Sequence, residues 1–269
     1  MNTLAIYNPA NGQLITTLPA DDATSVATKT AAARVAQPAW AATPMAERKA
    51  CIERFRSGVV RDLESLAVTL TRETGKPVKM SRNELNGLLG RIDFFLKEIE
   101  LAVATETVFD DGGMREQIQH TPLGVVANIS AWNYPWFVGC NVIVPALLTG
   151  NAVVYKPSEY ATMTGLEIAR LLHEAGVPRE VMVCLVGAGA VGAALLEQPV
   201  DGVFFTGSVA TGQRIARSPS LCASSVLVPT ILLGAPETTW ACWLEVLLRG
   251  RSFITGLRLR AVGLPSSRR

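Results

Sequence analysis

The pattern of apolar and polar positions predicts a largely helical first half of the chain. Residues 5–18 read as two short strands around an Asn-Pro-Ala-Asn-Gly turn, whose second Asn and Gly tolerate a positive φ. Apolar residues then recur at three- and four-residue steps from Ile52 to Leu70, which predicts one helix with a single buried stripe. A further amphipathic helix is predicted over residues 79–101.

Local signals predict the ends of the helix that carries this stripe. Thr43 is expected to cap its N-terminus, Pro44 to take the first helical position, and Glu47 to lie in the first turn. Gly75 and Pro77 are expected to end it, because glycine adopts the left-handed conformation at helix C-termini and proline cannot continue a helix.

Short strand-like runs alternate with helical ones after about residue 120. Strands are expected over 123–129, 152–155, 181–186 and 202–205, and helices over 138–148, 163–175, 191–197 and 209–216. Strands that are apolar on both faces and alternate with helices predict an α/β fold with a doubly wound parallel sheet. Ligands of such sheets bind beyond the carboxyl ends of the strands, so the residues directly after each strand are the candidates for chemistry.

These changes in pattern divide the chain into three regions. We expect an N-terminal helical and hairpin region over residues 1–120 and a dinucleotide-binding α/β region over 121–217. Residues 218–269 form a third region, which contains no Asp or Lys but has two Glu, six Arg and seven Ser. Its apolar pattern fits neither helix nor strand, so we expect it to be poorly ordered.

Composition narrows the class of protein. The 269 residues include 25 Lys+Arg and 23 Asp+Glu, for a net charge of +2, so no nucleic-acid partner is expected. Five cysteines without a CxxC pair argue against a disulfide framework or a metal site and fit the reducing cytoplasm. No signal peptide is predicted, and polar residues and prolines interrupt the apolar stretches, so no membrane span is expected.

The residues after the first two predicted strands are candidates for catalysis and ribose binding. Asn133 can donate its side-chain amide hydrogens to a developing oxyanion, or it can serve as a turn residue before Pro135. Lys156 and Glu159 can hold ribose hydroxyls, and the Glu159 carboxylate would repel a 2′-phosphate. The alternative for this segment is a solvated loop in which Ser158 caps the next helix.

Glycine-rich segments follow the third and fourth strands. Residues 187–192 read Gly-Ala-Gly-Ala-Val-Gly, a GxGxxG that opens a helix. No acidic residue stands about twenty residues further on, so tight helix–strand packing is favoured over pyrophosphate binding here. After the fourth strand, Gly207 permits a close backbone approach. Ser208 either presents a phosphate site together with the following amides or simply caps a helix.

Several segments together resemble the NAD(P)-dependent aldehyde dehydrogenase family, in particular its succinate-semialdehyde dehydrogenases. They are SAWNYPW, NVIVPALLTGNAVVYKPSE, EAGVP and FFTGSVATG, in this order and spacing, with YNPANGQ and RETGKP before them. The resemblance covers about residues 1–217 and implies a truncated aldehyde dehydrogenase fold with a Rossmann-like cofactor domain. It implies oxidation of a small aldehyde to a carboxylic acid with NAD, or alternatively NADP. It also implies a homo-oligomer, to which a strand near residues 116–120 would contribute.

The resemblance also implies roles for individual residues. Asn133 matches the asparagine that stabilises the oxyanion. Lys156 and Glu159 match the pair on the adenosine ribose, and the turn at 207–208 matches the pyrophosphate site. The cofactor residues implied in this way are Trp132, Lys156, Ser158, Glu159, Gly189, Gly192, Phe205, Gly207 and Ser208. Trp132 would line the cofactor cleft, while Gly189 and Gly192 would approach the adenosine.

Two elements of the family are not found in this sequence, the Glu-Leu-Gly-Gly segment with the base and the Gly-Gln-x-Cys segment with the thiol. Leu232 stands where the glutamate would be and cannot move a proton. Cys140 and Cys184 lie in apolar patterns and are expected to be inert, and His173 is expected to be a surface residue near a helix C-terminus. We therefore expect a replaced sequence from about residue 217 and an inactive chain. The alternative function is a dinucleotide-binding remnant or an assembly partner of an intact relative.

Overall fold

The computed structural model describes residues 2–216, 225–227 and 255–256, so most of the third predicted region lies outside the described residues. The chain begins with an antiparallel hairpin of β1 (Thr3–Tyr7) and β2 (Leu14–Pro19). In the turn between them, Gly12 has a φ of +71°, the left-handed conformation that a side chain disfavours. The predicted hairpin is therefore confirmed.

Four helices follow the hairpin, namely α1 (Ala23–Ala42), α2 (Met45–Arg61), α3 (Leu63–Thr74) and α4 (Val78–Ala102). The stripe from Ile52 to Leu70 is buried, as its periodicity predicts, except that Leu63 is partly buried. The prediction that a single helix carries this stripe is wrong, because the chain leaves helical geometry at Asp62 (φ −99°, ψ 9°). The Asp62 carboxylate accepts hydrogen bonds from Arg61 and Arg170 at this corner. A break of one residue hardly changes the spacing of a stripe, so periodicity did not show it.

The start of α2 also differs from the prediction. The helix begins at Met45, Pro44 is its N-cap residue, and no side chain caps it. The hydroxyl of Thr43 donates instead to the carbonyl of Ala39, 3.2 Å away in the helix before. Thr43 is therefore the C-terminal cap residue of α1 and not the N-terminal cap of α2. Glu47 lies in the first turn as expected.

The second half of the chain forms a five-stranded parallel sheet. Its strands are β6 (Val125–Ile129), β7 (Ala152–Lys156), β8 (Met182–Cys184), β9 (Gly202–Phe205) and β10 (Ser225–Leu227), in the order β10-β9-β6-β7-β8. All the pairings are parallel. The helices between them are α5 (Pro135–Leu148), α6 (Thr162–Glu174), α7 (Gly189–Leu196) and α8 (Val209–Ala216). The predicted doubly wound parallel α/β fold is confirmed.

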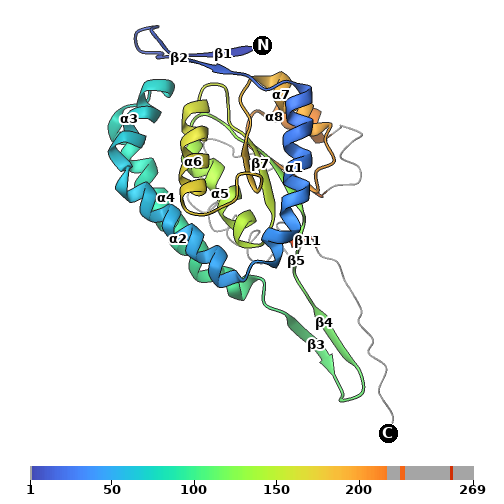
Figure 1. The fold of residues 1–269 in the computed structure, drawn as a ribbon. Coiled ribbons are helices and arrows are strands. Elements are labelled where there is room, and N and C mark those ends of the chain that lie inside the picture. Colours follow the sequence, from blue (N-terminus) through green and yellow to red (C-terminus); the bar gives the residue numbers. More distant parts are fainter. Residues whose placement is uncertain (1, 217–224, 228–254, 257–269) are drawn as a thin grey trace.

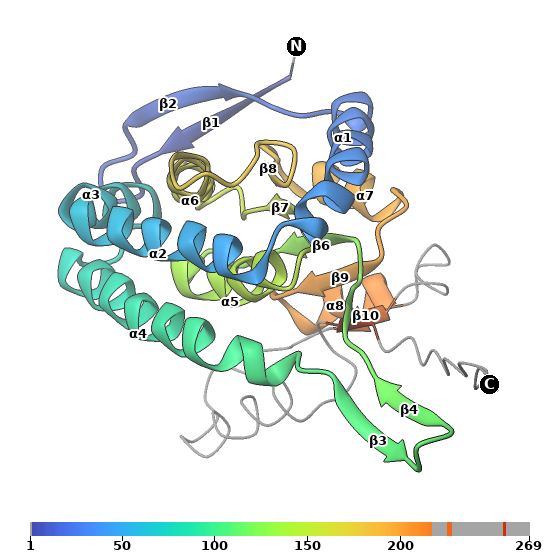
Figure 2. The ribbon, with the colours of Figure 1, turned by 60° about the horizontal axis from the view of Figure 1, so that its bottom comes forward.

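Helices cover both faces of this sheet. Helices α5 and α6 pack on each other and on β7 and β8, while α1 and α7 lie side by side and α1 also contacts β6, β7 and β8 (Figure 2). Helices α2, α3 and α4 pack outside α5 and α6. One cluster of buried apolar residues joins these helices to the sheet. Loops follow the carboxyl ends of the strands.

A separate ribbon extends from this body. Strands β3 (Glu106–Asp110) and β4 (Arg115–Ile118) pair antiparallel and project away from the sheet (Figure 1). Strand β5 (Thr121–Pro122) leads back into the body and pairs with β11 (Thr255–Gly256). Among the described residues, no helix combines the length and the apolar character that a membrane crossing would need. The division at residues 120 and 217 stays a prediction.

Candidate functional site

The sheet changes its direction of growth between β6 and β9. The chain adds β7 and β8 on one side of β6 and then places β9 on the other side. Across this boundary the N–H of Thr206 donates to the carbonyl of Ile129 (2.9 Å). On the other side of β6, the N–H of Ser130 donates to the carbonyl of Lys156 at the end of β7 (3.2 Å). Open parallel sheets bind ligands in the crevice at such a switch point. All four predicted segments lie at or directly after the carboxyl ends of parallel strands. They therefore lie along one edge of the sheet, the edge formed by these carboxyl ends.

Aromatic rings connect the loops after β6 and β7. Trp132 is 50% exposed, and its ring meets the ring of Tyr160 edge to face, with centroids 6.5 Å apart and an interplanar angle of 76°. Tyr160 directly follows Glu159 in the chain. The contact therefore brings Trp132 next to the segment that carries the predicted ribose residues. Sequence reasoning missed Tyr160, because a single exposed aromatic residue in a loop gives no signal of its own.

Lys156 is buried at the end of β7, with only 4% of its surface exposed. Its Nζ lies 3.3 Å from Oε2 of Glu159. Burial lowers the pKa of Lys156, and the neighbouring carboxylate opposes this shift. A solvated loop is therefore the wrong description of this segment. The structure also does not make Ser158 a helix cap, since its hydroxyl accepts the N–H of Tyr160 (3.3 Å) in the turn before α6.

The three glycines of the GAGAVG segment have different surroundings. Gly187 has a φ of +150°, and a Cβ built on it would overlap the side chain of Val191. At Gly189 and Gly192, no atom of the described part of the chain lies within 4 Å of a built Cβ. Tight packing thus explains the glycine at position 187. Gly192 is buried in α7, which contacts β6, so the favoured helix–strand packing of this segment stays compatible with the structure. The contact between Gly187 and Val191 depends on a bend of the chain at Gly187, and the sequence pattern does not specify this bend.

The turn after β9 places Gly207 against a ring of the sheet. A Cβ built on Gly207 would lie 2.5 Å from Cζ of Phe205, whose side chain is buried. The exposed Ser208 precedes α8, and its hydroxyl accepts the N–H of Thr211 at 3.3 Å. Ser208 therefore caps α8. The remaining N–H groups of a helix's first turn favour an anion, so the cap does not exclude a phosphate.

Asn133 lies in the turn between β6 and α5 and is partly exposed. Its side-chain oxygen accepts the N–H of Tyr134 at 3.1 Å, which is the turn role that the sequence allows. This bond engages the oxygen and not the amide hydrogens that oxyanion stabilisation requires. The turn role and the catalytic role are therefore compatible.

Two buried glutamates support the loops behind this edge. Glu73, at the end of α3, accepts the N–H groups of Met163 (2.9 Å) and Thr164 (2.6 Å) at the start of α6. Burial raises the pKa of Glu73 to about 7, and hydrogen bonds from Thr164 and from the backbone oppose the shift. Glu84 in α4 accepts the N–H of Trp136 (2.8 Å) at the start of α5. Both carboxylates therefore stand where the helix dipole favours negative charge.

The corner between α3 and α4 is tight because of Gly75. This residue has a φ of +77° and ends α3, as predicted, and a Cβ built on it would lie 2.8 Å from Cγ of Pro9. The RETGKP segment that forms this corner carries Glu73 and leads into α4. Sequence reasoning found the segment through its resemblance but gave its charged residues no role.

Among the described residues, Cys51 and Cys140 are buried and Cys184 is partly buried, and all three thiols are weakly acidic. Burial raises the pKa of Cys51 and Cys140, and it raises that of Cys184 to about 12. The prediction that Cys140 and Cys184 are inert agrees with these shifts, because only the thiolate is a nucleophile. Cys222 and Cys242 lie outside the described residues. No group of three acidic, cysteine or histidine side chains that would suit a metal ion occurs within the described ranges.

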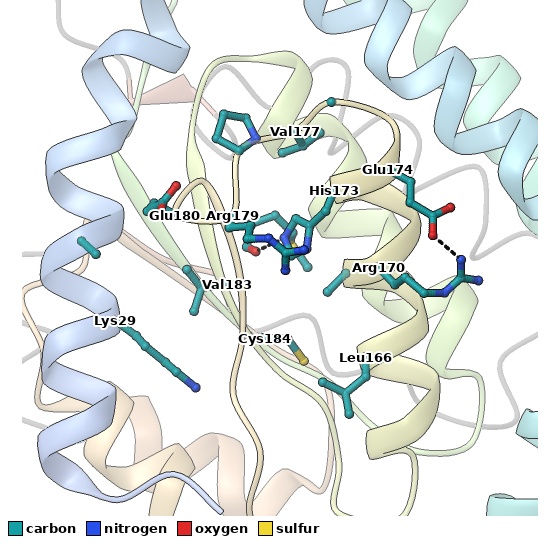
Figure 3. A pocket seen from close by; sticks show the side chains of 15 residues that line it. Lys29, Leu166, Arg170, His173, Glu174, Val177, Arg179, Glu180, Val183 and Cys184 are labelled. Carbon is teal, nitrogen blue, oxygen red and sulfur yellow. Dashed lines mark hydrogen bonds and ion pairs between the residues drawn. The ribbon is translucent and has the colours of Figure 1, made fainter. Parts of the chain in front are cut away.

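A cavity of about 740 Å³ lies between α1 and α6, along the edge strand β8 (Figure 3). Its wall includes Lys29, Arg179 and Cys184. His173 also lines it, and Nε2 of this histidine lies 2.8 Å from the carbonyl oxygen of Met182. His173 thus lies in the last turn of α6, as expected, and it is partly exposed and hydrogen bonded. None of the predicted catalytic or cofactor residues lines this cavity.

Comparisons with known proteins agree with this fold. Residues 1–235 match the aldehyde dehydrogenase family, which is further than the expected limit near residue 217. Over 186 residues the chain is 38% identical to the N-succinylglutamate 5-semialdehyde dehydrogenase of Sphingopyxis alaskensis. That alignment covers 69% of this chain and 39% of the relative.

Solved structures show the same fold. An NAD-dependent aldehyde dehydrogenase from Sinorhizobium meliloti superposes with a TM-score of 0.81 at 29% identity, over 85% of this chain and 47% of its own. An NADP-dependent glyceraldehyde-3-phosphate dehydrogenase from Bacillus halodurans, in complex with NADP, superposes with a TM-score of 0.80 at 29% identity, over 85% and 49%. The chain spans about two fifths to half the length of these proteins. It belongs to the aldehyde dehydrogenase family.

Proposed function

We propose that this chain binds NAD in the crevice between β6 and β9 and provides the cofactor-binding part of an aldehyde-oxidising enzyme. The observation that carries the proposal is the position of Trp132, Lys156 and Ser208 at the carboxyl ends of three neighbouring strands of one parallel sheet. The NADP complex of the Bacillus halodurans relative supports a dinucleotide as the ligand. NADP is the alternative cofactor.

Each residue of the edge has a role in this proposal. Lys156 and Glu159 hold the adenosine ribose, with Ser158 shaping their turn, and the Glu159 carboxylate favours NAD by repelling a 2′-phosphate. The turn at Gly207 and Ser208 receives the pyrophosphate at the N-terminus of α8. The ring of Phe205 supports this turn. The open space at Gly189 and Gly192 admits the adenosine, and Trp132 lines the cleft.

Asn133 would contribute to catalysis by donating a side-chain N–H to the oxygen of the aldehyde as negative charge develops there. Bound NAD would supply the acceptor for a hydride. Oxidation to an acid also needs a nucleophile and a base. The thiols of the described residues are protonated at neutral pH, and Leu232 stands where the base is expected. We propose that the isolated chain binds the cofactor without turnover.

Titration of the chain with NAD by calorimetry tests cofactor binding. Lys156→Gln should weaken binding at least tenfold, because a hydrogen bond from a charged donor contributes about 1.5–3 kcal/mol. Lys97→Gln is the matched control, since Lys97 pairs with Glu98 on the exposed face of α4 and is 82% exposed. No binding by the unaltered chain would contradict the proposed function. Equal effects of the two variants would contradict the placement of the ribose.

Production of NADH from succinate semialdehyde and from a simple aliphatic aldehyde tests the catalytic part. The expected result is cofactor binding with no turnover. Measurable turnover would overturn the inactive assignment, and Asn133→Ala should then reduce the rate by about 10²–10³. Turnover that Asn133→Ala does not change would contradict the placement of the oxyanion site.

A second proposal concerns assembly, and the β3–β4 ribbon supports it. All of β3 is exposed, including Val108 (51%) and Phe109 (43%). A two-stranded ribbon is at best marginally stable in isolation, so we propose that it pairs with a second copy or an intact relative. Sedimentation should show an oligomer that Phe109→Lys dissociates, and a monomeric chain would contradict this.

The free thiols fit a cytoplasmic location, which is also proposed.

A further inference from the structure

The corner between α3 and α4 inserts a lysine beneath the turn that carries Asn133. Nζ of Lys76 lies 2.6 Å from the backbone carbonyl oxygen of Asn133 and 2.5 Å from Oε2 of Glu84. It also lies 4.4 Å from the centroid of the Tyr134 ring. The side chain of Lys76 is 14% exposed and that of Glu84 is fully buried.

These contacts use all the donors of Lys76. An ammonium group has three hydrogens, and here it faces a carboxylate, a carbonyl oxygen and the negative face of an aromatic ring. Replacing the ammonium by an apolar group would leave the Glu84 carboxylate buried without its counter-ion, which is strongly unfavourable. The lysine therefore has one well-defined position.

Glu84 extends this network to the start of α5. Its second oxygen, Oε1, accepts the N–H groups of Trp136 (2.8 Å) and Phe137 (3.3 Å). Lys76 holds the turn at Asn133, and Glu84 holds it three residues later. The ion pair thus holds the end of the turn between β6 and α5 and the first residues of α5, although neither residue belongs to the sheet or its crossover helices.

We propose that Lys76 is a positioning residue, which directs the side chain of Asn133 toward the crevice by holding its backbone carbonyl. The carbonyl oxygen fixes the peptide plane after Asn133, and with it the direction in which the Cα–Cβ bond leaves the turn. This inference rests on the proposed role of Asn133. It means that the proposed oxyanion site also needs Lys76, a residue of the helical region that lies 57 positions before Asn133 in the chain.

The side-chain amide signal of Asn133 in a ¹H–¹⁵N spectrum is the direct readout, identified by its loss in Asn133→Asp. Lys76→Met should shift or broaden this signal and accelerate amide exchange at Trp136 and Phe137 more than tenfold. Arg82→Met is the matched control, because it removes the Arg82–Glu64 ion pair between α4 and α3, next to the corner that carries Lys76, without touching the turn. A merely structural role would give the two variants the same spectrum at Asn133.

Glu84→Gln serves as a second variant if Lys76→Met does not fold. Its amide oxygen can still accept the N–H groups of α5, while the charge that anchors Lys76 is lost. An unchanged Asn133 signal in the variant that folds would overturn the proposal. NAD affinity is measured on the same samples and should change less than twofold, since Lys76 lies below the turn. Failure of the unaltered chain to bind NAD would contradict the proposed function alone, because the Asn133 signal does not depend on NAD.

Discussion

The ring of Phe205 occupies the space that a side chain at position 207 would need. A Cβ built on Gly207 would lie 2.5 Å from Cζ and 3.1 Å from Cε2 of that ring. Phe205 is itself buried at the end of β9, so it cannot move away without disturbing the core. The position of the turn proposed to receive pyrophosphate is therefore tied to the packing of the sheet.

Gly207→Ala should reduce the free energy of unfolding by about 1–3 kcal/mol, because overpacking forces neighbouring side chains or backbone to shift. Urea denaturation measures this change. Gly90→Ala is the control, since Gly90 is exposed within α4 and no atom of the described residues lies within 4 Å of its built Cβ. It should leave stability equal or slightly higher. A similar effect of both variants would show that Phe205 does not exclude a side chain.

Substitutions at Ser208 should separate its capping role from its proposed phosphate role. Ser208→Ala should lower the free energy of unfolding by about 0.5–2 kcal/mol through loss of the bond to Thr211. Ser208→Asp should restore the cap but bind NAD more weakly than Ser208→Ala, because its carboxylate repels pyrophosphate. Calorimetry and urea denaturation give the two quantities. Normal NAD affinity in Ser208→Asp would contradict the proposal that this turn binds the pyrophosphate.

Glu73 should make the protein less stable as the pH rises. Its pKa in the folded state is raised from 4.5 to about 7, so the folded chain binds the proton more tightly than the unfolded chain. Stability from this group is then full below about pH 4.5 and is lost as the pH rises to about 7. Relative to Glu73→Gln, the unaltered chain should be more stable at about pH 5 than at about pH 8.

Urea denaturation across this pH range measures the difference between the two chains. Glu64→Gln is the control, because Arg82 lowers the pKa of the exposed Glu64 and keeps its carboxylate ionised throughout. Its difference from the unaltered chain should stay constant. A constant difference for Glu73→Gln as well would mean that burial does not govern the ionisation of Glu73.

The weakly acidic thiols of Cys140 and Cys184 should resist modification in the folded chain. A pKa of about 12 instead of 9.0 lowers the thiolate fraction of Cys184 at neutral pH by about 10³. Cys140 should behave in the same way, because burial raises its pKa too. Mass spectrometry after treatment with an aromatic disulfide reagent identifies the modified residues, with the urea-unfolded chain as reference. Because Cys184 lines the cavity between α1 and α6, rapid labelling of this residue in the native chain would show that its pKa is not raised.

Glu159→Gln should shift the cofactor preference toward NADP. Removal of one carboxylate from the vicinity of a 2′-phosphate should raise the ratio of NADP to NAD affinity about tenfold. Glu167→Gln on α6 is the control, since Glu167 pairs with Arg170 away from the crevice. Titrations with both nucleotides give the ratio, and an unchanged ratio in Glu159→Gln would place the ribose elsewhere.

Patterns of local spacing predicted the elements that carry the site. The helix over residues 209–216 and the strand over 202–205 coincide with α8 and β9, and the other predicted strands and helices differ by a few residues at their ends. The fifth strand of the sheet, β10, was not predicted. The break at Asp62 and the role of Thr43 were missed, because each depends on partners such as Arg170 or on the preceding helix. The sequence also showed no reason for Tyr160 to meet Trp132.

The sequence by itself determined the order of strands and helices and the segments that follow each strand, because the periods of strand and helix and the signals of turns act within a few residues. It also carried the resemblance that suggested the chemistry. Only the tertiary structure decided that Lys76 lies beneath Asn133 and that Gly187 packs while Gly189 faces open space. Such contacts join residues far apart in the chain or depend on the exact path of a bend, and their energies arise only when the core brings them together.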